Sequence, residues 1–268
     1  MRSAETKMEL GLKSKVAGIT GSANGIGKAI AEKFAVEGCR VLLCDVNEEM
    51  LGKTEKEFRQ KGYEVFAGRV DVTDQREIDD FISRACTKYG SVDIWVNNAG
   101  IYPQKEILDM TAEEWDRLFN INLKSVFLCT KSAVGWMKRR QTGVIINAAS
   151  FAALIPSAGS GGYAATKAAV LSMTRTLAAE LAPFGIRVNA YVPGVIETPM
   201  TQGVIEKKHG GLLSQIALHR LGQPGDVANA IVFLASDAAG YISGTYLEIS
   251  GGKLCVQNPD FGWEKQEL

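Results

Sequence analysis

The chain has 268 residues, of which 46% are hydrophobic and 22% charged, and its 30 basic side chains balance its 30 acidic ones. This composition is ordinary for a globular protein and lacks the basic excess that nucleic-acid binders carry. No apolar run approaches the ~20 residues of a membrane span, and residues 1–15 lack the apolar core of a signal peptide.

The first predicted element is an apolar strand over residues 16–20, which leads into a glycine-rich turn and then a helix that stops at Gly38. The turn reads Gly21-Ser22-Ala23-Asn24-Gly25-Ile26-Gly27. Glycines in this setting let the backbone approach a pyrophosphate, whose charge the helix N-terminus stabilises. The GxxxGxG spacing differs from the GxGxxG fingerprint of dinucleotide sites, so a purely structural turn is an equal alternative at this point.

A second apolar strand covers residues 41–44 and ends at Asp45. A carboxylate ~20 residues beyond the glycines is positioned to accept a hydrogen bond from the ribose 2′-hydroxyl of NAD, and it would repel the 2′-phosphate of NADP. Neither the turn nor Val46 and Asn47 supplies a cation for such a phosphate. The sequence therefore predicts NAD as the cofactor. The alternative is that Asp45 merely ends a strand and begins a turn.

Strands and helices then alternate along the rest of the chain. The further predicted strands are 64–70, 92–96, 143–147, 187–191 and 246–249, and the predicted helices are 48–61, 74–89, 111–140, 163–181 and 226–236. This alternation predicts an α/β fold with a Rossmann-like, doubly wound parallel sheet of about seven strands and helices on both faces. Ligands of such sheets bind at the carboxyl ends of the strands, where Gly21, Asp45, Asp71 and Asn98 fall. No linker or repeat interrupts the pattern, so residues 1–268 are predicted to form a single domain with a core of about 10–252.

Three further positions carry candidate chemistry. Asn122 lies on or beside an apolar helix stripe, where it either bends the helix or joins a polar network. Ser150 follows a strand and suits a hydrogen-bond donor better than a nucleophile, because no GxSxG surrounds it. Tyr163 and Lys167 lie one helical turn apart, a spacing that also occurs on exposed helices. An ammonium beside a phenol would lower the phenol pKa and make an acid/base for an alcohol oxygen.

The C-terminal third contains a segment predicted to be a loop and a tail. Residues 197–223 are polar and broken by glycines, which predicts a long substrate loop or lid. Within it, Lys207, Lys208 and His209 either meet an anionic substrate or form a solvated charged face. The tail, residues 253–268, contains Phe261 and Trp263 and is expected either to pack on something, such as a neighbouring subunit, or to fray. Its last four residues, 265–268, loosely resemble an endoplasmic-reticulum retention signal, which we attribute to chance.

Taken in order, these motifs make the chain similar to the short-chain dehydrogenase/reductase family, in its single-domain form, from about residue 10 to residue 252. The resemblance rests on Thr20 to Gly27, Asp71-Val72, Asn97 to Gly100, Asn122, Ser150, Tyr163-xxx-Lys167, and Pro193-Gly194 with Thr198.

The resemblance implies a catalytic set of Tyr163, Lys167, Ser150 and Asn122. Tyr163 would be the general acid/base, and Lys167 would lower its pKa and hold the nicotinamide ribose. Ser150, with Tyr163, would bind the substrate oxygen, and Asn122 would position a water that links Lys167 to solvent. The cofactor-binding residues implied are Gly21, Ser22, Asn24, Gly25, Ile26, Gly27, Asp45, Val46, Asp71, Val72, Asn98, Ala99, Gly100, Tyr163, Lys167, Pro193, Gly194, Ile196 and Thr198.

The function predicted is an NAD-dependent oxidoreductase that interconverts a secondary alcohol and a ketone by hydride transfer. A 3-oxoacyl-thioester reductase is an alternative, which Asp45 disfavours because such reductases usually take NADPH. A non-catalytic NAD(H)-binding protein is the second alternative. The Tyr-Lys-Ser-Asn set disfavours it, because a protein that only binds NAD(H) has no need of these residues. The family resemblance also implies a homo-oligomer, a tetramer or dimer. Five scattered cysteines without CxxC spacing are typical of reduced thiols in the cytoplasm, and no metal site is predicted.

Overall fold

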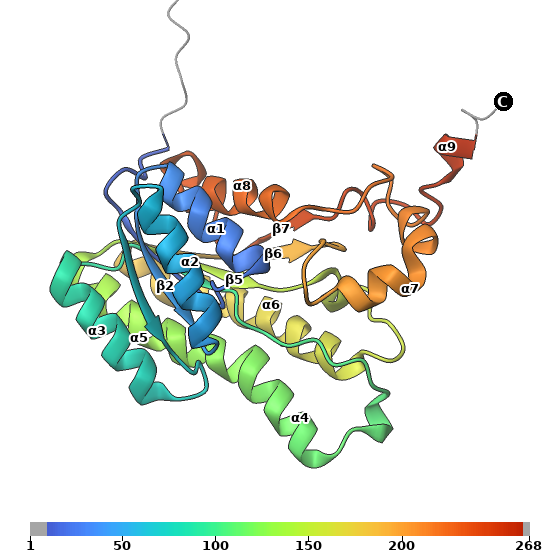
Figure 1. Ribbon diagram of the computed structural model, residues 1–268, viewed down its shortest axis with the longest axis horizontal. Coiled ribbons are helices and arrows are strands. Elements are labelled where there is room, and N and C mark those ends of the chain that lie inside the picture. Colours follow the sequence, from blue (N-terminus) through green and yellow to red (C-terminus); the bar gives the residue numbers. More distant parts are fainter. Residues whose placement is uncertain (1–9, 265–268) are drawn as a thin grey trace, which may run out of the picture.

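The computed structural model describes residues 10–264, which are built around one sheet of seven parallel strands (Figure 1). The strands are β1 (Val16–Thr20), β2 (Arg40–Asp45), β3 (Val65–Arg69), β4 (Ile94–Asn97), β5 (Gly143–Ala148), β6 (Ile186–Pro193) and β7 (Tyr246–Ile249). Their order across the sheet is β3-β2-β1-β4-β5-β6-β7, so the order in which successive strands are added reverses between β1 and β4. In sheets of this kind a ligand crevice lies at the carboxyl ends of the strands beside that reversal. The predicted doubly wound fold is confirmed.

Helices cover both faces of the sheet (Figure 1). They are α1 (Gly25–Val36), α2 (Glu48–Gln60), α3 (Gln75–Tyr89), α4 (Ala112–Phe119), α5 (Ser125–Arg140), α6 (Gly161–Leu181), α7 (Gln202–Leu213), α8 (Pro224–Ala235) and the short α9 (Phe261–Glu264). The apolar sides of α1, α2 and α8 pack on one face, and those of α3, α5 and α6 pack on the other.

The strands are apolar on both sides because both faces of the sheet are covered. In β2, Leu42 belongs to the core under α3 and α5, whereas its neighbour Leu43 belongs to the core under α1 and α8. Successive side chains of a strand point to opposite faces. A continuous apolar run is therefore what a central strand of this fold needs.

The segment predicted as one helix over 111–140 contains a π-helical turn at Asn120–Lys124, between α4 and α5. A π turn carries one extra residue relative to α-helical spacing, and such turns are frequent at functional sites. Asn122 is the buried residue of this turn. The structure therefore supports both alternatives considered for Asn122: it lies at an irregularity of the helix, and its amide joins a polar network.

The predicted loop over 197–223 is wrong in one respect, because it contains the twelve-residue helix α7. Gly203, Gly210 and Gly211 within it meet no neighbouring atom where a Cβ would stand. The opposite side carries Val204, Ile205, Leu212 and Leu213, which pack with Val195, Ile216 and Leu221. Burial of this apolar side overrides the low helix propensity of the three glycines.

The C-terminal tail packs on the segment that follows α7. The Trp263 indole nitrogen donates a hydrogen bond to the Ala217 carbonyl at 3.0 Å, and its ring stacks on His219 with centroids 4.9 Å apart. His219 Nε2 also lies 3.2 Å from Asp260 Oδ1. The tail thus packs on its own chain as far as residue 264. The features noted for residues 1–9 and for 265–268 lie outside the described residues. Within the described range, no helix is long and apolar enough to cross a bilayer.

Candidate active site

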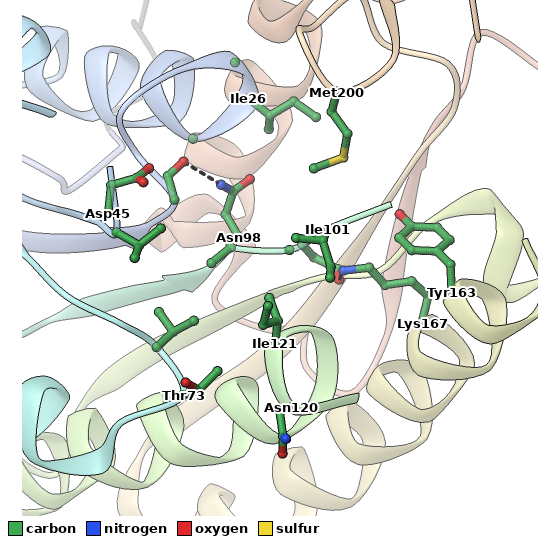
Figure 2. A pocket seen from close by; sticks show the side chains of 18 of the residues that line it. Ile26, Asp45, Thr73, Asn98, Ile101, Asn120, Ile121, Tyr163, Lys167 and Met200 are labelled. Carbon is green, nitrogen blue, oxygen red and sulfur yellow. Dashed lines mark hydrogen bonds between the residues drawn. The ribbon is translucent and has the colours of Figure 1, made fainter. Parts of the chain in front are cut away.

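A cavity of about 940 Å³ lies at the carboxyl ends of the strands, beside the reversal between β1 and β4 (Figure 2). Its volume is at the upper end of the range for small-molecule and cofactor sites. Sixteen of the residues implied by the resemblance line it: Gly21, Asn24, Gly25, Ile26, Gly27, Asp45, Val46, Asp71, Val72, Asn98, Ala99, Gly100, Tyr163, Lys167, Pro193 and Thr198.

The glycine-rich turn forms one wall of this cavity. Gly21 and Gly25 have φ angles of +65° and +54°, a region that side chains with a Cβ avoid. Helix α1 begins at Gly25 and has no side-chain cap, so the N–H groups of its first turn are free for a ligand. An uncapped helix N-terminus beside glycines suits the pyrophosphate of a dinucleotide.

Replacing Gly27 by alanine is expected to weaken dinucleotide binding at least about tenfold and to destabilise the fold by about 1–3 kcal/mol. The new Cβ would collide with the Gly21 carbonyl and lie 2.5 Å from Asn98 Nδ2, so the turn would have to shift. Fluorescence titration with NADH and thermal unfolding measure the two effects. Gly52→Ala in α2 is the matched control, because nothing lies within 4 Å of its Cβ position. Unchanged NADH affinity in Gly27→Ala would contradict this account of the turn.

Asn98 fixes the glycine-rich turn against the end of β4. Its side-chain nitrogen donates to the carbonyls of Thr20 and Gly21 at 2.9 and 3.1 Å. Its side-chain oxygen accepts from the buried Tyr191 hydroxyl at 2.8 Å. Figure 2 shows the Asn98 amide pointing at the turn. Asn98 therefore ties the ends of β1, β4 and β6 together, and its main role in this geometry is to hold the turn's shape.

Asp45 lies at the cavity edge, at the end of β2. One carboxylate oxygen accepts from Ala23 N at 3.0 Å and the other from Asn47 N at 2.9 Å. These bonds support the alternative interpretation, in which Asp45 ends a strand and begins a turn. A carboxylate oxygen has further lone pairs, so these two bonds leave capacity for a ribose hydroxyl. The cavity residues at the ends of β2 and β3, 45–46 and 70–73, include two carboxylates and no cation.

Asp71 is held by the residues that follow β3. Its Oδ1 accepts hydrogen bonds from the Thr73 backbone N and hydroxyl at 2.9 and 2.7 Å. Both bonds lower the pKa of Asp71 below its ordinary value, and the bond from the Thr73 hydroxyl has the larger effect. Thr73 also lines the cavity, although no sequence motif indicated it. Its place two residues after an aspartate at a strand end could have indicated it, because Asp and Thr side chains at this spacing form local hydrogen bonds.

Tyr163 and Lys167 line the cavity, and Ser150 lies beside Tyr163 without lining the cavity itself. Ser150 follows β5, is buried, and hydrogen-bonds with Tyr163. Lys167 is only 4% exposed, and its Nζ donates to the Ala148 carbonyl at 2.8 Å. That Nζ lies 5.7 Å from the centroid of the Tyr163 ring. Figure 2 shows both side chains reaching from α6 toward the cavity.

The expected lowering of the phenol pKa by Lys167 is wrong for these side chains alone. Burial raises the pKa of Tyr163 to about 12, and the hydrogen bond with Ser150 offsets this only in part. Burial also lowers the pKa of Lys167 to about 8. The low-dielectric surroundings disfavour both charged forms and outweigh the attraction between them. The phenol is therefore protonated at neutral pH in this arrangement.

Asn122 lies beside Lys167, on the other side of Gly100. Its side-chain oxygen accepts from Ile101 N at 2.8 Å, and its nitrogen donates to the Ile101 carbonyl at 2.9 Å and to Thr166 Oγ1 at 3.4 Å. A Cβ on Gly100 would stand 3.3 Å from Asn122 Oδ1 and 3.7 Å from Lys167 Nζ. The amide thus binds the backbone next to the lysine, and the implied water relay stays a prediction.

Some implied residues do not reach the cavity wall. Ser22 is fully buried, and its hydroxyl donates to the Cys44 carbonyl at 3.3 Å, which makes it a support of the turn. Gly194 lies against Ser250, and Ile196 is 3% exposed in the core. The cavity also has lining residues that the sequence did not indicate: Val70, Thr73, Ile101, Glu113, Asp116, Arg117, Asn120, Ile121, Ala148, Ala149, Tyr191, Pro199 and Met200. Five of them come from α4 and the π turn, and tertiary packing decides how closely these segments approach the strand ends.

These residues fit a dinucleotide with a nicotinamide end at Tyr163 and an adenosine end at Asp45 and Asp71. The fit rests on an uncapped helix N-terminus, on glycines whose Cβ positions are blocked, and on carboxylates at the end away from the tyrosine. The described residues contain no group of three or more His, Cys, Asp or Glu arranged to hold a metal.

Known proteins resemble this chain over nearly its whole length. Residues 21–253 match the sequence family described as Enoyl-(Acyl carrier protein) reductase. A 3-oxoacyl-[acyl-carrier-protein] reductase of Thermotoga maritima is 43% identical over 90% of this chain and 98% of its own. A diacetyl reductase of Staphylococcus epidermidis is 41% identical over 89% and 98%. The crystal structure of the protein gox2181 superposes with a TM-score of 0.90 at 34% identity, covering 92% of this chain and 98% of its own.

Fold, strand-end cavity and sequence relatives agree with one another. The chain belongs to the short-chain dehydrogenase/reductase family and is an oxidoreductase that works with a nicotinamide cofactor.

Proposed function

We propose that this protein is an NAD-dependent enzyme that interconverts a secondary alcohol and a ketone. The observation that carries the proposal is the position of Tyr163 and Lys167 in the wall of a dinucleotide-sized cavity, with Ser150 hydrogen-bonded to Tyr163. The names of two relatives support the reaction class, since 3-oxoacyl thioesters and diacetyl are both ketones.

In the proposed mechanism the nicotinamide, when bound, supplies the hydride chemistry, and the protein handles the proton. Ser150 hydrogen-bonds the substrate oxygen and holds it near the Tyr163 hydroxyl. Tyr163 gives its proton to that oxygen during ketone reduction and takes it back during alcohol oxidation. Lys167, held by the Ala148 carbonyl, keeps a positive charge beside the phenol and binds the ribose of the cofactor.

The proposal is tested by screening secondary alcohols with NAD and with NADP and following the absorbance of the reduced cofactor. We expect kcat/KM for NAD to exceed that for NADP about 100-fold, because Asp45 would repel a 2′-phosphate. Asp45→Asn should reduce this ratio about tenfold or more. Asp80→Asn, on the surface of α3 beside Arg84, is the matched control. A preference of the wild type for NADP would refute the cofactor assignment.

A 3-oxoacyl-thioester reductase is the second candidate, favoured by the identity of the Thermotoga relative. An N-acetylcysteamine thioester of acetoacetate distinguishes the candidates in the same assay. Faster turnover of this thioester with NADPH than of any alcohol with NAD would support the second candidate. A non-catalytic NAD(H)-binding role would be supported if NADH binds and no substrate is turned over.

We further propose a single domain, a cytoplasmic location and a homo-oligomer. The cytoplasmic assignment is supported by five free cysteines, four of them buried. The homo-oligomer is supported by exposed apolar side chains on helices and turns, among them Phe127 at 50% and Tyr241, which is fully exposed. Sedimentation of the intact chain, and of a chain ending at Gly252, tests the assembly and the part the tail plays in it.

A further inference from the structure

Lys253 lies against Phe151, the residue that follows Ser150, although about a hundred residues separate them in sequence. It follows β7 and the Gly251-Gly252 turn, and its Nζ lies 5.2 Å from the centroid of the Phe151 ring. Phe151 is the residue directly after Ser150. The residue after β7 also packs closely on the end of β6, because a Cβ on Gly194 would stand 2.8 Å from the Cα of Ser250. The residues that follow β7 therefore place an ammonium against the ring of the residue after Ser150.

This ammonium has no acidic partner in the described part of the chain. The hydrogen bond of its Nζ goes to the neutral Gln215 side chain at 2.6 Å, on the segment between α7 and the tail. The backbone N of Lys253 binds Ser250 Oγ at 3.1 Å, which fixes the base of the side chain. An ammonium has three donors, so capacity remains for an anion.

The partial burial of Lys253 makes the lack of an acidic partner in the described residues unfavourable for its ammonium. The side chain is half-buried, and this burial lowers its pKa below the ordinary value. Water stabilises the charge of a surface lysine without a partner, whereas the charge of a partly buried lysine is stabilised by a nearby anion. Lysines elsewhere in the chain illustrate the contrast, since Lys28, Lys61 and Lys105 each have a glutamate partner.

We propose that Lys253 binds a carboxylate of the substrate, so that the substrate is a hydroxy acid or keto acid. This inference rests on the proposed function, because it places the acid group beside the residue that follows Ser150. Phe151 would pack against the carbon chain between the acid group and the reacting carbon. Gln215 would give up or share its bond with the ammonium when the acid binds.

The test compares matched substrates, each hydroxy acid with its methyl ester, such as 3-hydroxybutyrate and methyl 3-hydroxybutyrate. Wild-type kcat/KM should be at least about tenfold higher for the acid, as expected for one charge-assisted hydrogen bond. Lys253→Met should remove this preference mainly through KM and leave the ester within about twofold. Lys253→Arg should retain most of it. NADH affinity should not change in either variant, since Lys253 does not line the cofactor cavity.

Lys207→Met is the control for the loss of a lysine charge, because Lys207 is an exposed lysine of α7. If Lys207→Met removes the preference for acids and Lys253→Met does not, the assignment is wrong. It is also overturned if the wild type prefers the esters, or if Lys253→Met lowers acid and ester turnover equally.

Calorimetric titration of the acids onto the enzyme–NADH complex separates this inference from the proposed function. Acid binding that is lost in Lys253→Met supports the anion site even if no alcohol is oxidised. Oxidation of alcohols together with equal binding of acids by wild type and Lys253→Met would leave the proposed function standing and refute the anion site.

Discussion

Replacing Tyr163 by phenylalanine is expected to lower kcat about 10³-fold, within the range by which positioned acid–base groups accelerate reactions. The substitution removes one hydroxyl from a partly buried ring that Tyr102 contacts edge-on, with centroids 4.8 Å apart. Because the ring remains, we expect the dissociation constant of NADH to change less than about threefold. Stopped-flow kinetics with the best alcohol, and NADH fluorescence titration, measure the two quantities.

Tyr63→Phe serves as the control for loss of a tyrosine hydroxyl, since Tyr63 packs on Phe58 beside α2 and lies outside the cavity. The pH profile adds a second readout. With the pKa of Tyr163 raised to about 12, the phenol holds its proton through neutral pH, as ketone reduction requires. Alcohol oxidation needs the deprotonated form, so its kcat/KM should rise with pH. Retained turnover in Tyr163→Phe would end the assignment of Tyr163 as the acid/base.

Replacing Lys167 by methionine is expected to damage two functions at once. We expect kcat to fall about 10²-fold or more, because the charge beside the phenol is lost. NADH should also bind at least about tenfold more weakly, because a hydrogen bond to a charged group is lost. This double effect separates Lys167 from Tyr163, whose loss should spare binding. Lys53→Met is the control, because Lys53 is an exposed lysine of α2 paired with Glu49.

The same substitution should change the pH dependence of stability. The folded-state pKa of Lys167 is lowered to about 8 from a reference of 10.5, so between these values the unfolded chain binds more protons than the folded one. Stability should therefore rise with pH from about 8 to about 10.5 in the cofactor-free wild type. Lys167→Met should lack this rise. Urea unfolding at pH 7, 8, 9 and 10 measures the difference between the two proteins, and parallel curves would contradict a lowered pKa of Lys167 in the folded state.

The sequence predicted the strands and their ligand face well because both depend on local patterns. A run such as Val41 to Cys44 can hardly form anything but a covered strand, and a polar residue that ends it falls at the ligand edge. The positions of Gly21, Asp45, Asp71 and Asn98 at the cavity follow from those strand ends alone. The structure agrees on each.

The differences arise where tertiary contacts decide. Helix α7 forms despite its glycines because Leu212 and its neighbours bury one side of it. Ser22 follows Gly21 in the turn, yet its hydroxyl points to the Cys44 carbonyl instead of the cavity. The pKa of Tyr163 depends on how much protein surrounds the ring, which spacing to Lys167 does not reveal. In each case the decisive neighbours are distant in sequence.

The packing of the tail against residues 215–219 has a consequence for how the protein is made. Synthesis proceeds from the N-terminus, and structure can form as the chain emerges. All the residues that line the cofactor cavity, from Gly21 to Met200, precede α7 in the chain. The contacts of the tail form later, since Lys253 reaches Gln215, and Trp263 reaches Ala217, only after residues 253–263 have left the ribosome. A newly made chain should therefore be able to bind the dinucleotide before it can select a substrate.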